Sequence, residues 1–249
     1  MAKPKKEGGG FLLSVDIDRP GKELADQFPF NVPAIAKTEH LAFHKKMTFF
    51  VGENGSGKST LLEAIAMRAG FNAEGGTKNF RFSTARTESS LHRHVRLARG
   101  RQEQDGFFLR AESFFNVASQ IDEIGMKGAY GGVSLHEQSH GESFLALVEH
   151  RFGRDGLFLM DEPEAALSPQ RQLALLAFMD TLVQHMRGQM VIATHSPILL
   201  AYPDAKIYAF GENGIVEQEY EDTEHYLITR DFLNNRERFF RRLFVPPGE

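Results

Sequence analysis

The chain has 249 residues, a formal net charge of −4 and no cysteine. Its length predicts one large domain, or a core with an inserted subdomain, that buries a substantial apolar core. The lack of cysteine excludes disulfides, thiol catalysis and cysteine-ligated zinc, and the acidic balance excludes a global attraction to nucleic acid or to acidic membranes. No apolar run approaches the length that crosses a bilayer, so we expect a cytoplasmic protein without membrane insertion.

The N-terminal part of the chain is irregular before its first strong motif. Residues 1–10 are basic and then glycine-rich, which predicts a disordered start. Loose alternation over residues 11–18 predicts an early strand, and two prolines make residues 28–36 extended or loop-like. A single domain is therefore expected to cover residues 11–249.

The strongest motif lies between the apolar run 47–51, which predicts a buried strand, and residues 58–69, which predict a helix. The glycines between them let backbone N–H groups turn inward around a triphosphate. Lys58 reaches the β- and γ-phosphates, and the Ser59 hydroxyl is placed to ligate Mg²⁺. An ordinary glycine-rich turn is the alternative, and the flanking strand and helix weigh against it. The predicted nucleotide-binding residues are Gly52, Glu53, Asn54, Gly55, Ser56, Gly57, Lys58, Ser59 and Thr60.

The most basic stretch of the chain follows, over residues 78–101. Its only acidic residue is Glu88, and its arginines are Arg81, Arg86, Arg93, Arg96, Arg99 and Arg101. A solvated face is the plainer interpretation, and we favour it. A patch that contacts phosphate groups is the sharper alternative.

The second half of the chain alternates between short apolar runs and helical patterns. Strands are predicted over residues 107–110, 156–160 and 190–194, helices over residues 113–124, 141–152 and 169–186, and a glycine-rich loop over residues 125–132. Residues 206–210 and 215–220 predict a hairpin, and residues 223–244 predict a helix that alternates aromatic residues with arginines. No internal repeat and no heptad run is present.

One of these strands ends in residues that carry chemistry. Residues 157–160 are apolar and lead directly into Asp161 and Glu162. A buried strand that delivers carboxylates at its C-terminal end puts them beside the metal and the γ-phosphate that the glycine-rich loop holds. Asp161 is then expected to hold Mg²⁺ through water, and Glu162 to polarise the attacking water. Two acids after an apolar run are a weak signal alone, and they become a strong one beside a phosphate-binding loop.

Four motifs fall in the order and approximate spacing of an ABC-type ATPase: residues 52–59 (Walker A), 139–142 (signature), 161–163 (Walker B) and His195. The resemblance covers nearly the whole chain. It is greatest to the soluble, non-transporter group that holds the SMC, double-strand-break-repair and OLD-like ATPases, in a compact stand-alone form. It implies an α/β fold of the ABC-type P-loop NTPases, with a mixed central sheet, an antiparallel β subdomain and an inserted helical signature subdomain at about residues 113–153. It also implies ATP hydrolysis, with ATP and Mg²⁺ bound.

The resemblance implies that Ser139, His140, Gly141 and Glu142 contact the γ-phosphate of ATP bound to the other protomer. A serine hydroxyl and the amides of a helix N-terminus make an anion site. His140 stands where a glycine is usual, and Glu142 takes a place that often holds glutamine, so this segment departs from the family pattern. A polar loop that caps a helix through Ser139 is the alternative. Ser168 also departs, because it replaces the usual aspartate of the loop that connects the two sites.

His195 matches the switch histidine of the family, which follows a strand and contacts the γ-phosphate. Imidazole suits that task because it donates to phosphate and relays a hydrogen bond to the glutamate region. The alternative is a histidine that simply satisfies a partner at a strand end.

Two further family features have several candidates. The family carries a glutamine near Mg²⁺ and the attacking water, where Glu112 is a candidate ligand and Gln102 and Gln104 are alternatives. An aromatic residue upstream of the phosphate-binding loop stacks on adenine. Its candidates are Phe28, Phe30 and Phe43, and core packing is the alternative role for each.

These motifs predict a Mg²⁺-dependent ATPase that forms a head-to-tail homodimer with two ATP molecules at the interface, so that hydrolysis releases the clamp. We expect a task in DNA maintenance or phage defence, with a nucleic acid or a nuclease or effector chain as partner. Two alternatives stay open. One is the nucleotide-binding subunit of an ABC transporter, and the other is an ATP-gated scaffold whose C-terminal segment recruits a partner protein.

Overall fold

The structure is a computed structural model that describes residues 9–78, 89–111 and 140–244. Its strands are β1 (Leu12–Ile17), β2 (His40–Ala42), β3 (Met47–Val51), β4 (Val95–Arg99), β5 (Asp105–Arg110), β6 (Gly156–Asp161), β7 (Gln189–Ala193), β8 (Lys206–Gly211) and β9 (Gly214–Gln218). Its helices are α1 (Lys22–Ala25), α2 (Pro33–Ala36), α3 (Lys58–Ala69), α5 (His140–Arg151), α6 (Pro169–His185), α7 (Pro197–Leu200), α8 (Glu224–Asn234) and α9 (Arg236–Leu243). Short 3₁₀ helices are η1 (Ser90–Arg93), η4 (Pro163–Ala166) and η5 (Tyr220–Asp222).

The larger of two sheets has the strand order β5-β6-β7-β3-β8-β9. Neighbours from β5 to β8 pair in parallel, and β9 pairs antiparallel with β8 across a tight turn. The smaller sheet is antiparallel, with the order β2-β1-β4. This mixed central sheet with a separate antiparallel sheet confirms the predicted α/β fold, and it confirms the hairpin predicted over residues 206–220.

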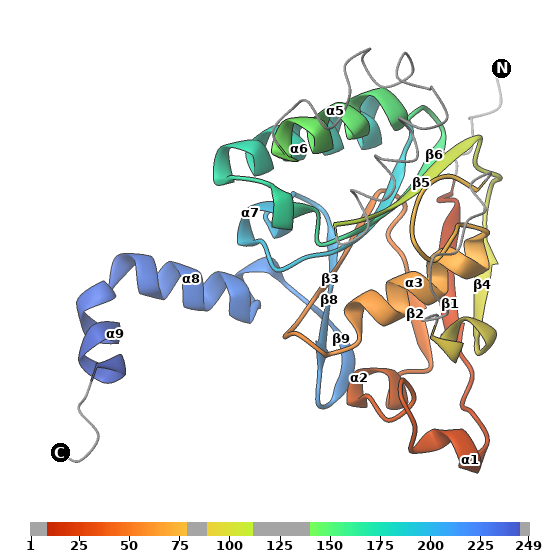
Figure 1. Ribbon diagram of the computed structural model, residues 1–249, viewed down its shortest axis with the longest axis horizontal. Coiled ribbons are helices and arrows are strands. Elements are labelled where there is room, and N and C mark those ends of the chain that lie inside the picture. Colours follow the sequence, from red (N-terminus) through yellow and green to blue (C-terminus); the bar gives the residue numbers. More distant parts are fainter. Residues whose placement is uncertain (1–8, 79–88, 112–139, 245–249) are drawn as a thin grey trace, which may run out of the picture.

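The central strands are apolar throughout because both faces of the larger sheet are covered. In β3, Met47 and Phe49 pack in the core that α5, α6 and α7 share, whereas Phe50 points to the other face and packs with α3 and the smaller sheet. Figure 1 shows α5 and α6 on one side of the strands, with α3 and the smaller sheet on the other. The fold therefore has a layered core on each face of the larger sheet.

Buried Gln189, at the start of β7, joins the two sheets. Its Oε1 accepts hydrogen bonds from the backbone N–H groups of Phe11 (2.7 Å) and Leu12 (2.8 Å). Its Nε2 donates to the carbonyl oxygens of Leu12 (2.7 Å) and His44 (2.9 Å). Because every polar atom of this amide has a partner, its burial fixes the smaller sheet against the larger one.

Three neighbouring strands end at the same edge of the larger sheet. The strands β6, β7 and β3 are parallel neighbours, so their C-terminal ends lie side by side. The glycine-rich loop follows β3, Asp161 closes β6, and His195 comes two residues after β7. Crevices outside the C-terminal ends of parallel strands are where α/β proteins bind ligands. The topology thus brings three of the predicted motifs together.

The helices α8 and α9 extend away from the layered body, as Figure 1 shows. We call residues 224–244 the C-terminal arm. Neither helix has a buried residue, and Leu233, Leu243 and Phe244 are 66%, 65% and 72% exposed. The single helix predicted over residues 223–244 was wrong, because Asn235 leaves the helical conformation (φ −135°, ψ 41°) and separates two helices.

Two other segments differ from their predictions. The stretch 28–36 is not extended throughout, because Pro33 opens the short helix α2, where a fixed φ and a missing N–H suit the first turn. The basic stretch 78–101 contains β4, whose polar residues hid the alternation of Val95 and Leu97. The helix predicted over residues 141–152 is confirmed as α5.

Several predictions fall on residues that the structure does not describe. Two predicted elements lie outside the described residues: the helix at residues 113–124 and the loop at residues 125–132. The same is true of residues 1–8, which form most of the predicted disordered start. Of the helical subdomain predicted at about residues 113–153, the structure describes only the part from residue 140 onward. Within the described ranges, no helix is both long enough and apolar enough to cross a membrane.

Candidate nucleotide-binding site

The loop between β3 and α3 turns tightly around its own backbone. Gly52, Gly55 and Gly57 have positive φ angles of 146°, 79° and 98°, which side chains disfavour. A Cβ on Gly52 would also lie 2.6 Å from the carbonyl oxygen of Phe210. The buried hydroxyl of Ser56 has no hydrogen-bond partner among the described residues. The first backbone N–H groups of α3 have no acceptor within the helix, so the loop offers several donors to an anion.

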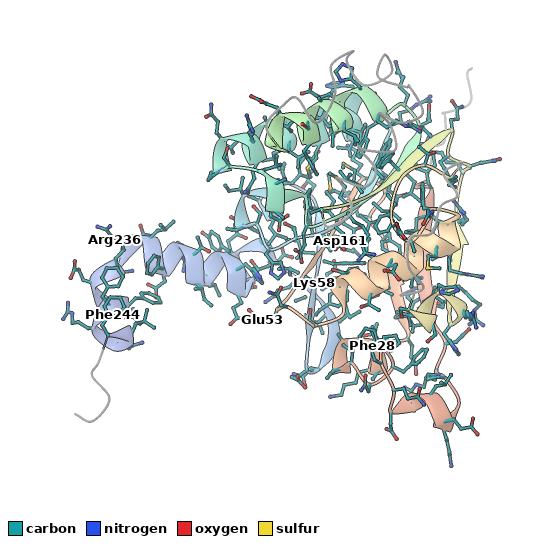
Figure 2. All side chains as sticks on the ribbon, viewed as in Figure 1. Phe28, Glu53, Lys58, Asp161, Arg236 and Phe244 are labelled. Carbon is teal, nitrogen blue, oxygen red and sulfur yellow. The ribbon has the colours of Figure 1, made fainter. Side chains whose placement is uncertain are left out.

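Lys58 is only 3% exposed, so it places a buried positive charge at this loop. Its Nζ donates to the carbonyl oxygens of Gly52 (2.7 Å) and Glu53 (2.9 Å). Burial lowers the pKa of Lys58, and the carboxylates of Glu162 and Asp161 act in the opposite direction. A buried ammonium group is stabilised by a nearby anion, so the loop and Lys58 fit phosphate groups. Figure 2 shows Lys58, Glu53 and Asp161 gathered at this edge of the sheet.

A hydroxyl and a carboxylate meet beside Lys58. The Oγ of Ser59, on the first turn of α3, donates to Oδ1 of Asp161 at 2.8 Å. Both are hard oxygen ligands, and Mg²⁺ takes few of these from a protein because it keeps waters and substrate phosphates. Within the described part of the chain, no cluster of three or more His, Cys, Asp or Glu side chains is arranged to hold a metal ion. The pair therefore fits Mg²⁺ that binds together with a phosphate group.

The structure describes two of the three candidates for a further metal ligand. Glu112 lies outside the described residues. Gln102 and Gln104 precede β5, which pairs in parallel with β6, so they lie at the opposite edge of the sheet from Asp161. The two glutamines are thus excluded as neighbours of the predicted metal site.

Arg110, at the end of β5, is a neighbour of Asp161 that the sequence analysis missed. Its Nη1 donates to Oε2 of Glu63 at 2.7 Å and to the carbonyl oxygen of Ala73 at 3.2 Å. Its Nε lies 3.7 Å from Oδ2 of Asp161. The predicted metal ligand therefore has an arginine on one side and the Ser59 hydroxyl on the other. The signal that was available is position, because Arg110 ends a strand next to the one that Asp161 ends.

The two predicted catalytic residues come together from the ends of β6 and β7. Glu162 adopts a left-handed conformation (φ 51°, ψ 51°), which is uncommon outside glycine and concentrates at functional sites. Its N–H donates to the carbonyl oxygen of Ala193 at 2.9 Å. Its Oε1 lies 3.5 Å from Nε2 of His195, and its side chain is 39% exposed. A carboxylate that is held in place and still reached by solvent suits contact with water.

Two neighbours of His195 were not predicted. Oε1 of Glu164 accepts a hydrogen bond from the backbone N–H of His195 at 2.5 Å, and burial raises the pKa of Glu164. Nε2 of His225, on the first turn of α8, lies 2.9 Å from Nδ1 of His195. Burial lowers the pKa of both histidines, and the charge of Lys58 lowers that of His195 further. No local pattern marks His225, because it reaches the site through the tertiary fold.

A cavity of about 640 Å³ opens beside the glycine-rich loop. Its walls come from α2, residues 52–56, the end of β8 and the start of α8, and its apolar side chains include Val32, Pro33, Leu227 and Ile228. None of the aromatic candidates Phe28, Phe30 and Phe43 lines it. Phe30 and Phe43 are core residues, at 3% and 9% exposed, whereas Phe28 is 63% exposed.

The signature-like segment is described from His140 onward, and Ser139 lies outside the described residues. A Cβ on Gly141 would lie 2.5 Å from Nη1 of Arg171, and Oε1 of Glu142 lies 2.9 Å from Nη2 of that arginine. Ser168 caps α6, since its hydroxyl accepts a hydrogen bond from the N–H of Arg171 at 3.4 Å. The glycine of this segment therefore has a packing reason within the chain.

The basic stretch is largely neutralised where the structure describes it. Arg96 pairs with Asp18 at 2.9 Å, Arg101 pairs with Asp155 at 2.8 Å, and Arg99 pairs with Glu103. Of the four described arginines, only Arg93 has no carboxylate partner among the described residues. This pairing favours the solvated face over a patch that contacts phosphate groups.

A family model described as an AAA domain matches residues 30–123, which include the glycine-rich loop and α3. No curated protein matches the chain.

The solved structures that are similar to this one include the following three. A metal-chelate type ABC transporter in an inward-facing conformation has 18% identity over 87% of this chain and 88% of that chain, with a TM-score of 0.48. The SMC head domain from Thermotoga maritima has 15% identity over 84% and 99%, with a TM-score of 0.45. The protein cbiO1 from Clostridium perfringens, part of the ABC transporter complex cbiONQ, has 14% identity over 94% and 100%, with a TM-score of 0.49. The family match covers the glycine-rich loop and α3, so this part of the chain is similar to an AAA domain.

Proposed function

We propose that the protein binds ATP with Mg²⁺, hydrolyses the γ-phosphate and works as an ATP-gated dimeric switch. The observation that carries this proposal is the meeting of Lys58, the Ser59 and Asp161 pair, and the Glu162 and His195 pair at one edge of the larger sheet. Phosphoryl transfer depends on positioning and charge stabilisation more than on covalent chemistry by the protein. These side chains supply both.

The nucleotide is bound by the loop, by Lys58 and by the adjoining cavity. The loop N–H groups and the Lys58 ammonium group balance the charge of the phosphates. Ser59 and Asp161 hold Mg²⁺, which neutralises charge on the phosphate oxygens. The apolar walls that α2 and α8 contribute to the cavity of about 640 Å³ suit the faces of a nucleobase.

Glu162 and His195 act in the hydrolysis step. The Glu162 carboxylate accepts a hydrogen bond from the attacking water and orients it. The imidazole of His195 is neutral at pH 7 because burial lowers its pKa, and its Nε2 faces the same carboxylate at 3.5 Å. An N–H at that position donates to the γ-phosphate or to Glu162 without adding a full charge.

The switch requires two protomers. In the head-to-tail dimer that we propose, the segment Ser139, His140, Gly141 and Glu142 of one protomer completes the site of the other, as the resemblance to ABC-type ATPases implies. Hydrolysis removes the phosphate that both protomers grip, so the dimer opens. A cytoplasmic location belongs to the same proposal.

The first test is ATP turnover and nucleotide affinity of the wild-type protein with Mg²⁺, beside the Lys58→Ala variant. We expect hydrolysis by the wild type and a loss of about 100-fold or more in Lys58→Ala, because a phosphate contact in a low-dielectric site is removed. Lys22→Ala is the matched control, since Lys22 is an exposed lysine on α1. A wild type that binds no nucleotide, or a Lys58→Ala variant that turns over normally, would contradict the proposal.

The task that we propose for the switch is DNA maintenance or phage defence, with a nucleic acid or a nuclease or effector chain as partner. Support for phosphate contact comes from the C-terminal arm, not from the paired arginines of the basic stretch. Arg236, Arg241 and Arg242 have no carboxylate partner within the described chain, and all three are exposed. Positive charge on an exposed helix is what contact with a phosphate backbone requires.

Duplex DNA binding, measured as a function of salt concentration, distinguishes the arginines of the C-terminal arm from those of the basic stretch. We expect the double variant Arg241→Gln/Arg242→Gln to weaken binding and to flatten the salt dependence by about one to two contacts. Arg96→Gln, which removes a paired arginine, is the control that leaves both unchanged. If wild-type protein binds no DNA or RNA and its turnover ignores both, a protein partner becomes the remaining form of this proposal.

A further inference from the structure

The ring of His195 lies between a carboxylate and a second imidazole. Its Nε2 lies 3.5 Å from Oε1 of Glu162. Its Nδ1 lies 2.9 Å from Nε2 of His225, with the ring centroids 5.1 Å apart and the planes inclined by 45°. His225 belongs to α8, so the start of the C-terminal arm touches the predicted catalytic pair directly.

The two contacts favour one placement of the protons on the imidazoles. A neutral imidazole carries one N–H, and an ionised carboxylate only accepts hydrogen bonds. Nε2 of His195 has no hydrogen-bond partner within the described residues, and the Glu162 carboxylate 3.5 Å away favours the tautomer with the proton on Nε2 and a lone pair on Nδ1. The N–H on Nε2 of His225 then donates to that lone pair. Burial lowers the pKa of both histidines, and this favours the neutral rings that the arrangement needs.

The start of α8 is anchored to the segment that carries His195. Thr223, which precedes α8, is fully buried, and its Oγ1 donates to the carbonyl oxygen of Tyr220 at 2.7 Å. The hydroxyl of Tyr220 donates to the carbonyl oxygen of Pro197 at 3.0 Å. Pro197 begins α7 only two residues after His195. The backbone on both sides of the histidine contact is thus fixed by a separate set of hydrogen bonds, which keeps the His225 ring in place.

From this geometry we infer that His225 is a positioning residue: its N–H holds His195 in the tautomer and orientation that present Nε2–H to Glu162 and to the γ-phosphate. The inference rests on the proposed ATPase function and adds to it a residue from outside the four motifs. It also makes the arm a part of the catalytic machinery at its first turn.

The test compares two substitutions of the same residue. His225→Gln keeps an N–H close to the position of Nε2, whereas His225→Leu keeps the volume and removes the donor. We expect kcat for ATP to fall about 10-fold or more in His225→Leu, the range for residues that orient a functional group, with KM changed less than about 2-fold. His225→Gln should recover most of the rate. Leu233→Ala, at an exposed position further along α8, is the control that leaves the rate unchanged.

Nitrogen-15 NMR of the histidine rings provides a readout that does not depend on activity. We expect the Nε2–H tautomer of His195 in the wild type and in His225→Gln, and a mixture of tautomers in His225→Leu. His195→Gln assigns the signals. Equal tautomer populations and equal kcat in His225→Leu and the wild type would overturn the inference. If the wild type has the expected tautomer and no ATPase activity, the proposed function fails while the imidazole contact stands.

Discussion

The strand-end edge of the larger sheet and the C-terminal arm are built on opposite principles. At the edge, the strands β3, β6 and β7 are buried along their whole length, and the side chains that they deliver have defined partners. On the arm, no residue is buried and several large apolar side chains face solvent. Charged groups that are held in place before the reaction require buried surroundings with defined partners, as at the strand-end edge. The arm joins the site through its first turns, at His225, Leu227 and Ile228, so its outer part is free to contact other molecules.

The largest expected effect belongs to the edge. Glu162→Gln should lower turnover by about 10³-fold and leave ATP affinity nearly unchanged, because the amide keeps the size of the carboxylate and loses its capacity to accept the proton of water. Steady-state turnover and nucleotide titration measure the two quantities. The control is Glu221→Gln, which changes an exposed carboxylate on η5. Turnover within a few-fold of the wild type would remove Glu162 from the catalytic role.

The contrast in burial predicts a contrast in stability. Phe158 is fully buried in β6 and stacks on Phe152 with ring centroids 4.4 Å apart, whereas Phe244 is 72% exposed. Phe158→Ala should lower the free energy of unfolding by about 3 to 5 kcal/mol. Phe244→Ala should change it by less than about 0.5 kcal/mol. Denaturant unfolding of both variants measures this difference. A large loss in Phe244→Ala would show that the arm packs against something other than solvent.

A smaller effect is expected from pH. The pKa of His195 lies below its ordinary 6.5, chiefly through burial and then through Lys58, and Glu162 and Glu53 act against this lowering. His225 is lowered by burial too. As the pH falls through these lowered pKa values, both rings gain protons and neither offers a lone pair to the other. Turnover should therefore be level from pH 8 to about 6.5 and decline several-fold in more acid solution.

The pH profile needs one control, because burial raises the pKa of Glu164, whose carboxylate binds the backbone of His195. Glu164→Gln should keep the acid decline if the histidines cause it. Loss of the decline in Glu164→Gln would transfer the effect to that carboxylate. A flat profile down to pH 5 would contradict the role of neutral histidines.

Local patterns were sufficient to predict which residues lie together at the strand-end edge. The loop at residues 52–59 is contiguous and Asp161 follows an apolar run, so the glycines, the lysine and the acids were identified before their distances were known. Elements set by short-range polar patterns were harder, as β4 and α2 illustrate. The break at Asn235 was missed because no proline or glycine marks it in residues 223–244.

Contacts between distant parts of the chain were beyond the sequence. Arg110 reaches Asp161 only because β5 and β6 are parallel neighbours. His225 reaches His195 only because η5 and Thr223 fold the start of α8 back against α7. Spacing along the chain carries no signal for either contact. The apolar cavity wall on α8 also depends on the tertiary fold. For this reason, the aromatic candidates upstream of the loop did not predict this wall.

We propose that ATP closes two copies of this chain around the strand-end edge. The direct measurement is the molar mass of the Glu162→Gln protein by light scattering, with Mg²⁺ and either ATP or ADP. We expect the mass to double with ATP, and to stay at that of one chain with ADP and in Glu162→Gln protein that also carries Lys58→Ala. A mass that is the same with ATP, with ADP and without nucleotide would contradict the switch.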